Sequence, residues 1–302
     1  MNQFTELFEE KFAVRQSYVK NLEAFRLVNK DETNWEIAVD MYGIANAVVH
    51  LFREIDDEDL HMIKEGLKKA FGTKKVFFKN RTKNKSWDLP IEKSDLIQVT
   101  ENNHKFIINL VDYVDMGLFL DHRETRKKIE KLAQGKVFLN LFAYTGSFTV
   151  YAAAGRAIKT HTVDLSKTYC EWARNNLDLN GLKPEDNWVY KMDSLEFLRY
   201  AKRKNLVFDL MVIDPPTFSK NKTESWSVQR DHYELLKAAH ELLSPNGEIF
   251  FSNNFTGFIM DRKLNELFKI KDITAESIPL DFKFTFEVGT PIHTCFLLKK
   301  LN

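Results

Sequence analysis

Cysteine is nearly absent from this sequence, and long apolar runs are missing. The 302 residues include only two cysteines, Cys170 and Cys295. Two thiols in a chain of this length exclude a cysteine-rich metal site and indicate a reducing compartment. No segment approaches the roughly 18 apolar residues that cross a membrane, and Glu6, Glu9 and Glu10 stand where a signal peptide would need an apolar core. We therefore expect a cytoplasmic protein with no membrane partner and no metal.

The sequence also lacks an excess of either charge. Its 44 basic and 43 acidic residues leave a formal net charge of +1. Any affinity for nucleic acid must therefore come from local patches. Segment 73–87 is such a patch, because it contains six basic residues and no acid: Lys74, Lys75, Lys79, Arg81, Lys83 and Lys85. It is a candidate for phosphate contact, and a solvated, flexible loop is the alternative.

Hydrophobic periodicity in the first third of the chain predicts a small α+β domain over residues 1–100. Apolar residues at helical spacing from Phe4 to Phe25 predict an amphipathic opening helix. Further expected elements are strands at 25–28, 35–39, 45–52 and 75–78 and a helix at 57–71. A hairpin of strands 96–100 and 106–111 then leads into a second domain, which we expect over residues 101–302.

From Lys136 onward, expected strands alternate with expected helices. The strands are 137–142, 160–163, 187–190, 208–213 and 248–252, and the helices are 147–154, 167–179, 195–202 and 228–243. This alternation predicts an α/β fold with a doubly wound, Rossmann-like parallel sheet, preceded by the small α+β domain. In such sheets the chemistry lies at the carboxyl ends of the strands.

The first strand of this sheet ends in a turn that carries a single glycine, Gly146. Dinucleotide-binding turns have three glycines, so this turn is of another kind. One glycine lets the backbone approach a ligand at one point, and the N-terminus of the following helix favours a carboxylate. The predicted cofactor contacts in the turn are Asn140, Phe142, Ala143, Tyr144, Gly146, Ser147 and Phe148.

The next two strand ends supply carboxylates. Asp164 lies 18 residues after Gly146, where a carboxylate can accept hydrogen bonds from both hydroxyls of a ribose; a helix start is the alternative. Asp193 follows the third strand and is placed to bind the exocyclic amine of an adenine. The predicted contacts here are Asp164, Leu165, Ser166, Asp193 and Ser194. A ligand with a carboxylate, a ribose and an adenine is S-adenosylmethionine, which we expect as the cofactor.

The fourth strand ends in Asp214, Pro215, Pro216, Thr217 and Phe218. Two adjacent prolines fix the backbone and expose carbonyls that no strand ladder uses. A stiff edge of acceptors followed by an aromatic ring suits a flipped base, which needs hydrogen bonds at its edge and stacking on its face. The alternative is an ordinary turn with Phe218 in the core. We predict Asp214, Pro215, Pro216 and Phe218 as the catalytic group.

Several of these motifs resemble a known family. The turn 140–146, the step 163–166 and the segment 214–218 are similar to class I S-adenosylmethionine-dependent methyltransferases that modify RNA. Segments 112–123, 214–219, 228–232 and 251–254 more closely resemble the guanine-N7 methyltransferase (K) half of the bifunctional bacterial large-subunit ribosomal RNA methyltransferases of the KL type. The resemblance covers nearly the whole chain, whereas the half that methylates a guanine amine has no counterpart here.

The resemblance implies an enzyme of rRNA processing that methylates guanine N7, with ribosomal RNA or an assembling large subunit as its partner. It implies that the small domain contacts RNA, that Arg123 reaches the cofactor carboxylate, and that Asp214 and the Pro215 carbonyl hold a base on which Phe218 stacks. It also leaves room for a separate protein that supplies the second methyltransferase half.

The chemistry of the motif favours guanine N7 among the possible targets. This nitrogen has an in-plane lone pair and no proton, so its methylation needs no general base. Enzymes that make 5-methylcytosine need a cysteine nucleophile, but the fifth strand ends in Ser252 and Asn253, and we expect both cysteines to be structural. We also expect His232 to order its helix rather than act as a general base, and His122 and His293 to be structural or substrate-contacting. The alternatives are methylation of an exocyclic amine (guanine N2 or adenine N6) or of cytosine C5, a small-molecule methyltransferase, and a non-catalytic RNA-binding assembly factor.

Overall fold

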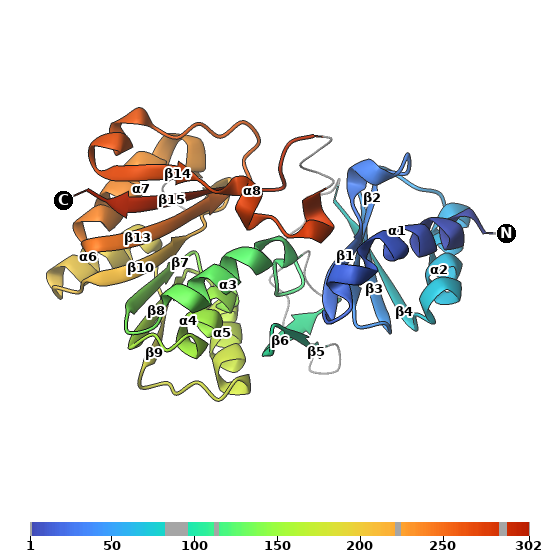
Figure 1. Ribbon diagram of the computed structural model, residues 1–302, viewed down its shortest axis with the longest axis horizontal. Helices are drawn as coiled ribbons and strands as arrows, with labels where there is room; N and C mark the ends of the chain where they lie inside the picture. Colours follow the sequence, from blue (N-terminus) through green and yellow to red (C-terminus); the bar gives the residue numbers. More distant parts are fainter. Residues whose placement is uncertain (1, 82–95, 112–114, 221–224, 284–288, 302) are drawn as a thin grey trace. The chain divides into compact units, whose positions relative to one another are not determined.

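The computed structural model divides the chain into two compact units. It describes residues 2–81, 96–111, 115–220, 225–283 and 289–301. The first unit comprises Met1–Asp121 and Pro279–Thr290, and the second comprises His122–Ile278 and Pro291–Asn302 (Figure 1). The first boundary therefore lies at Asp121 rather than at residue 100, and the chain returns to the first unit near its end. Asp281 is one reason for the return, because it accepts a hydrogen bond from the Arg26 N–H (3.0 Å) through its carboxylate.

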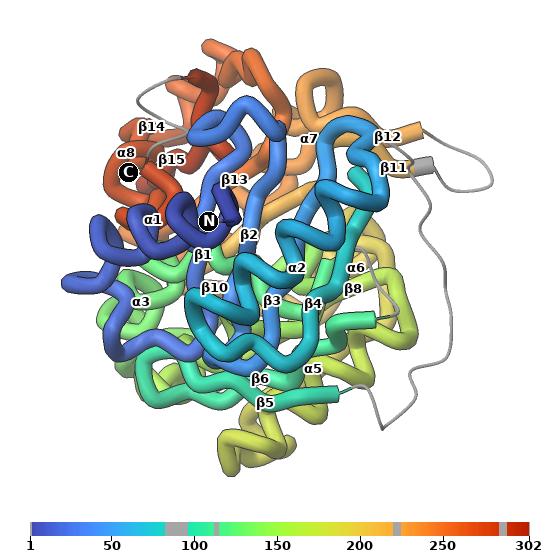
Figure 2. The backbone as a smooth tube through the Cα atoms, turned by 90° about the vertical axis from the view of Figure 1, so that its right-hand side faces the viewer, coloured from blue at the N-terminus to red at the C-terminus, as the bar shows by residue number. Residues whose placement is uncertain are grey.

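The first unit contains a four-stranded sheet covered on one face by two helices. Its elements are α1 (Gln3–Val19), β1 (Ala24–Val28), η1 (Lys30–Glu32), β2 (Ile37–Tyr42), β3 (Asn46–Leu51), α2 (Asp57–Phe71), β4 (Lys75–Asn80), β5 (Leu96–Glu101), β6 (His104–Asn109) and η5 (Leu280–Phe282). The order is β1-β2-β3-β4, in which only β3 and β4 pair in parallel, and β5 with β6 forms a separate hairpin. Helices α1 and α2 pack against each other and against the sheet (Figure 2).

Local sequence signals explain the ends of these helices. The side chains of Asn2 and Asp56 accept hydrogen bonds from first-turn N–H groups and so cap α1 and α2. Gly72 ends α2 in the left-handed conformation. Helix α1 ends at Val19, so the expected apolar stripe is broken before Phe25, which belongs to β1.

The second unit is the predicted doubly wound sheet. Its elements are η3 (Leu120–His122, at the boundary), α3 (Arg123–Leu132), β7 (Val137–Leu141), α4 (Ser147–Ala154), β8 (Lys159–Asp164), α5 (Lys167–Leu179), β9 (Asn187–Lys191), α6 (Ser194–Arg203), β10 (Phe208–Ile213), β11 (Phe218–Lys220), β12 (Ser225–Ser227), α7 (Val228–Glu241), β13 (Leu243–Asn253), η4 (Arg262–Glu266), β14 (Phe268–Asp272), α8 (Thr274–Ser277) and β15 (Thr294–Lys300). The strand order is β14-β15-β13-β10-β7-β8-β9. The five strands from β13 to β9 are parallel, and β15 pairs antiparallel with both β13 and β14.

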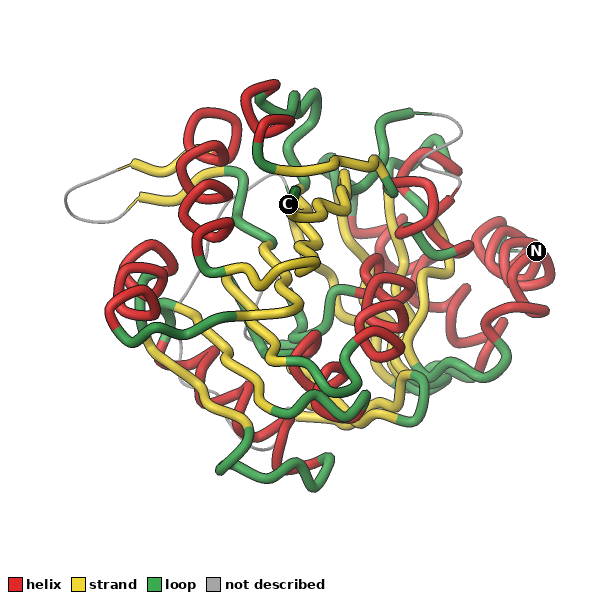
Figure 3. Tube along the Cα trace, turned by 60° about the vertical axis from the view of Figure 1, so that its left-hand side comes forward, coloured by secondary structure: helices red, strands yellow, loops and turns green. Residues whose placement is uncertain are grey.

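Helices cover both faces of this sheet, which is why its central strands read as nearly continuous apolar runs. Leu139 and Met211 point into a core with α6 and α7, while the alternating residues Phe138 and Val212 point into a second core with α3 and α4. The strands lie between the two layers of helices in Figure 3. The α/β, Rossmann-like prediction is therefore confirmed.

The segment after the two prolines contains two short strands that the sequence pattern does not predict. Strands β11 and β12 pair antiparallel, with Phe218 opposite Ser227 and Ser219 opposite Trp226. Polar side chains on a short exposed hairpin resemble those of a loop, so the sequence pattern missed it. Part of the basic patch (82–87), segment 112–114 and Lys222 lie outside the described residues. No helix in the described part of the chain is both long and apolar enough to span a membrane.

Candidate active site

The chain order of the parallel strands reverses between β7 and β10. Strands β7, β8 and β9 follow one another toward one edge, whereas β10 and β13 follow one another toward the other. The connections that leave the two central strands therefore diverge, and the carboxyl ends of strands at such a switch point are where doubly wound sheets form their ligand-binding crevice. Because Ile213 pairs with both Leu141 and Phe251, the segments that follow β7, β10 and β13 begin side by side.

The turn after β7 is held in a strained backbone conformation. Phe142, Tyr144 and Gly146 have φ angles of 55°, 49° and 74°, and the left-handed region is costly for the two aromatic residues. Gly146 is needed for a second reason, because a Cβ there would lie 2.8 Å from the Cβ of Ala173 in α5. The close packing places the turn against α5. Helix α4 begins directly after Gly146, and the N–H groups of a helix's first turn have no partner within the helix and favour an anion.

Asp164 at the end of β8 braces this turn. Its Oδ2 accepts from the Tyr144 N–H and its Oδ1 from the Ser166 N–H, both at 2.9 Å. Burial raises the pKa of the Asp164 carboxyl, and these backbone hydrogen bonds oppose the rise. A carboxylate has about four lone-pair sites, so the fixed carboxylate keeps acceptor capacity for the hydroxyls of a ribose. The residue that caps α5 is Ser166, and the bond from the Ser166 N–H means that Asp164 also supports the start of this helix.

Two other predicted residues have structural contacts. The buried Asn140 amide donates to Thr149 Oγ1 (3.1 Å), so this side chain supports the turn from within the sheet. Asp193 caps α6, because its Oδ1 accepts from the N–H groups of Leu195 (2.9 Å) and Glu196 (3.2 Å). The cap holds the Asp193 carboxylate by one oxygen at the end of β9.

The remaining predicted cofactor residues differ in exposure. Leu165 is 58% exposed and follows Asp164 at the strand edge, where an apolar side chain can cover a purine face. Ala143, Phe148 and Ser194 are buried, and Ser147 begins α4. Arg123 is buried at the first residue of α3. The buried side chains can shape a ligand site indirectly, because their packing fixes the backbone that surrounds it.

Asp214, directly after β10, is the half-buried carboxylate of the crevice. Ser252 at the end of β13 donates its hydroxyl to Asp214 Oδ1 at 2.7 Å. The Nε2 of His122 lies 3.6 Å from Oδ2, which is an ion-pair distance rather than a hydrogen bond. The sequence analysis did not assign Ser252 to the site, although adjacent strands that end together would have indicated it.

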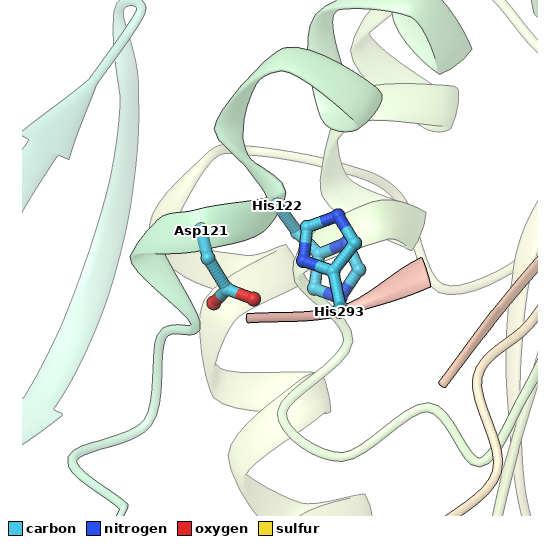
Figure 4. A group of neighbouring side chains, drawn as sticks. All are labelled: Asp121, His122 and His293. Carbon is cyan, nitrogen blue, oxygen red and sulfur yellow. The ribbon is translucent and has the colours of Figure 1, made fainter. Parts of the chain in front are cut away.

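His122 packs on His293, as predicted for residues with a structural role. Their rings are stacked with centroids 4.1 Å apart and planes 14° from parallel (Figure 4), and His293 Nε2 is hydrogen-bonded to the Ser277 hydroxyl at 2.9 Å. The lone pair of an imidazole nitrogen lies in the plane of its ring. In two stacked rings these planes are nearly parallel, so the lone pairs do not converge on one ion. The pair therefore favours ring packing over joint ligation of an ion.

Phe218 is an exposed aromatic side chain at the crevice. It is 65% exposed and makes an edge-to-face contact with Phe255 (centroids 5.9 Å apart). The alternative that Phe218 is a core residue is therefore wrong.

The backbone around Phe218 is held by two further contacts. The Trp226 indole N–H of β12 donates to the Pro216 carbonyl at 3.1 Å, and the Thr217 hydroxyl donates to Asn254 Oδ1 at 2.6 Å. The Pro216 carbonyl is thus occupied within the chain. Both contacts stiffen the Asp214–Phe218 segment beyond the effect of the prolines.

Both ring nitrogens of His232 in α7 bond backbone groups. Nδ1 lies 2.9 Å from the Val228 carbonyl and must carry the proton there, while Nε2 accepts from the Asp261 N–H at 2.9 Å. Burial lowers the pKa of His232, which favours this neutral form. His232 therefore orders the segment after β13 and is not placed as a general base.

A sequence model of a family described as S-adenosylmethionine-dependent methyltransferases matches residues 45–284. The chain belongs to this family. S-adenosylmethionine is thus its cofactor, and the prediction of an enzyme is confirmed. The strained turn, the fixed Asp164 carboxylate and the start of α4 fit the methionine and ribose parts of that cofactor.

The methyltransferase has a similar curated relative in Neisseria meningitidis serogroup B. That protein is named ribosomal RNA large subunit methyltransferase K and is 39% identical over 295 residues, which cover 92% of this chain and 81% of the relative. A solved structure of SMU.776, assigned as a methyltransferase and complexed with SAH, superposes with a TM-score of 0.82 at 25% identity over 98% of this chain and 80% of that chain. A structure assigned as a SAM-dependent methyltransferase from Streptococcus mutans gives a TM-score of 0.81 at 25% identity with the same coverage.

Neither cysteine of the methyltransferase is placed for catalysis. Burial raises the pKa of Cys170 in α5 to about 11 and that of Cys295 in β15 to about 12, so both thiols stay protonated at neutral pH. We expect Cys170→Ala and Cys295→Ala each to retain methyl transfer, and iodoacetamide to label the wild type only after denaturation. Loss of activity in a folded variant, judged by its thermal melting, would contradict this and favour a cytosine C5 reaction.

Proposed function

We propose that this enzyme methylates N7 of a guanine in large-subunit ribosomal RNA. The observation that carries the proposal is a half-buried carboxylate, Asp214, beside an exposed ring, Phe218, at the switch point of a methyltransferase sheet. The relative named for large-subunit ribosomal RNA methylation supports the substrate class.

The site suits a reaction that needs positioning and no base. When bound, S-adenosylmethionine supplies an electrophilic methyl group. Guanine N7 presents its lone pair without losing a proton, so the protein has to orient the base and exclude water. Both nitrogens of His232 are committed to the backbone, and both thiols are protonated.

Asp214 is matched to guanine in particular. The Watson–Crick edge of guanine offers N–H donors at N1 and N2, which one carboxylate can accept together. Adenine has a hydrogen-bond acceptor at N1. In the same position, this nitrogen would face the Asp214 carboxylate, another acceptor, with no proton between them. The carboxylate also stabilises the positive charge that develops on the ring as N7 is methylated. In this proposal Phe218 stacks on the base, and the Pro215 carbonyl adds an acceptor.

The first unit has a surface suited to RNA phosphates. A hollow of about 350 Å³ is lined by Lys64, Lys74 and Lys75, with Phe77 and Ile97 among its apolar residues. Lysines around an apolar floor can bind the backbone and one face of an unpaired nucleotide. This supports our proposals that the small domain contacts RNA and that the enzyme acts on rRNA or an assembling subunit in the cytoplasm. That a separate protein supplies a second methyltransferase half stays a prediction.

The test is mass spectrometry of nucleosides from rRNA incubated with the protein and isotope-labelled S-adenosylmethionine. The rRNA comes from cells that lack the gene, so that the target is unmodified. We expect label in 7-methylguanosine from the large-subunit RNA. Label in N2-methylguanosine, N6-methyladenosine or 5-methylcytidine would overturn the assignment of N7, and absence of label in both naked RNA and precursor particles would overturn the substrate class.

Removal of the exposed ring should separate RNA binding from cofactor binding. We expect Phe218→Ala to weaken RNA binding by about 1–3 kcal/mol, because base–aromatic stacking contributes free energy of that order. The affinity for S-adenosylmethionine should not change, since Phe218 is exposed and its recorded ring contact is with Phe255. Filter binding of RNA and calorimetry of the cofactor measure the two effects; equal losses in both would assign Phe218 a role in the fold.

A further inference from the structure

The segment after β13, residues 254–261, is an irregular loop with exposed apolar side chains. Ile259 is 71% exposed and Phe255 is half-buried. The loop leaves the end of β13, the neighbour of β10, so it begins beside the segment that carries Asp214 and Phe218. The Thr217–Asn254 hydrogen bond (2.6 Å) and the Phe218–Phe255 ring contact join the two segments. We name residues 254–261 the rim loop.

The rim loop has no regular secondary structure, yet side chains from α7 hold its backbone. The Gln229 amide donates to the Ile259 carbonyl and accepts from the Ile259 N–H, both at 2.9 Å. His232 accepts from the Asp261 N–H at 2.9 Å. Phe258 anchors the middle of the loop, because its ring packs against His232 and Phe251 with centroids 4.8 and 5.6 Å away. The backbone of Ile259 is therefore fixed while its side chain faces solvent.

Charge around the rim loop favours an anionic partner. Residues 254–260 carry no charged side chain. Asp261 follows them and accepts from the Lys263 N–H at 2.8 Å, so it caps the next turn, and Glu266 is the next acid along the chain. The two residues after Asp261 are Arg262 and Lys263, both exposed. A fixed apolar surface next to cations fits a base with its phosphate better than it fits an acidic or purely apolar protein surface.

We propose that the rim loop binds an unpaired ribonucleotide next to the target guanine. Phe255 and Phe218 form an aromatic corner at the mouth of the site, and Ile259 packs on the base or sugar of the flanking nucleotide. When a base is extruded for chemistry, the neighbouring base loses its stacking partner. A fixed apolar surface can replace the lost stacking contact whatever the RNA sequence. Gln229 and His232 are positioning residues that keep the surface in place. This inference rests on the proposed RNA substrate.

The test compares Ile259→Ala and Phe255→Ala with a matched control at the opposite end of the strands, where their amino ends lie. Ile158→Ala is the control, because Ile158 is 56% exposed and precedes β8 at its amino end. The probe is unmodified large-subunit rRNA, with binding measured by filter assay, methyl transfer by label incorporation and cofactor affinity by calorimetry. We expect RNA binding to fall about 5- to 100-fold for Phe255→Ala and about 3- to 10-fold for Ile259→Ala, with unchanged cofactor affinity and no effect of the control.

A double-mutant cycle distinguishes positioning from general stability. Gln229→Ala should weaken RNA binding about as much as Ile259→Ala, and the double variant should lose little more, because both act on the same surface. Additive losses would overturn the positioning role of Gln229. Normal RNA binding and methylation by both Phe255→Ala and Ile259→Ala would overturn the inference while leaving the proposed function intact. Defects seen only on ribosomal particles would also overturn it, in favour of a protein partner, and a wild type that methylates no RNA would overturn both proposals.

Discussion

Asp164→Ala is expected to abolish binding of S-adenosylmethionine while leaving the sheet folded. The carboxylate fixes the strained turn through the Tyr144 N–H and the start of α5 through the Ser166 N–H, and we expect it to supply the acceptors for the ribose. A hydrogen bond to a charged group contributes about 1.5–3 kcal/mol. Loss of two hydrogen bonds to the ribose, together with loss of the support for the turn, should weaken cofactor binding by roughly 10²- to 10⁴-fold, as measured by calorimetry.

The control for this variant is Asp209→Ala. Asp209 is the second residue of β10, at the opposite, amino end of the strand, and it also accepts two hydrogen bonds, from the Val137 N–H (2.9 Å) and the Ser244 hydroxyl (2.6 Å). The Asp209→Ala variant should lower the melting temperature about as much as Asp164→Ala but leave cofactor affinity unchanged. If both variants lose the cofactor equally, Asp164 acts through stability and is not a ribose ligand.

Asp214→Asn should remove most methyl transfer and leave the cofactor affinity near that of the wild type. The amide keeps the shape of the side chain but replaces one acceptor by a donor, which faces the N–H groups of a guanine edge. Loss of one partner in a desolvated charged contact costs about 2–5 kcal/mol, so kcat/KM should fall roughly 30- to several thousand-fold. Steady-state label transfer to unmodified rRNA measures this.

Asp209→Asn is the matched substitution for this second test, and it should retain wild-type kcat/KM. A parallel loss of cofactor affinity in Asp214→Asn would show that the residue shapes the crevice and does not contact the base. The Ser252 hydroxyl is the other partner of the same carboxylate, so Ser252→Ala in the Asp214→Asn background should add little if the two act as one unit.

The sequence predicted the elements whose signals are local. Helices α2, α4 and α5 and strand β10 have the expected bounds, because caps, glycines and apolar periodicity mark their ends within a few residues of chain. The same reasoning located the one-glycine turn, Asp164 and Asp214, since a strand that stops at a polar residue is visible without any knowledge of its neighbours.

Features that depend on contacts between distant segments were missed. The first unit runs past residue 100 and regains residues 279–290, because Asp281 and the Arg26 N–H are 255 positions apart. The contacts of Asp214 with Ser252 and His122 join positions that are far apart in sequence. The anchoring of Ile259 by Gln229 spans 30 residues, and no pattern in either segment indicates it.

The fold class, the cofactor and the residue types at each strand end could be predicted from the sequence alone. Apolar period, caps and turn residues act over short distances, and the chemistry of a carboxylate or a thiol belongs to the residue. Which of these groups meet depends on the tertiary structure: Phe218 is exposed beside Phe255, Asn140 and Asp193 have structural contacts, and both ring nitrogens of His232 bond backbone groups. The reason is that strand order and register, which bring these segments together, depend on long-range packing that no short stretch of sequence encodes.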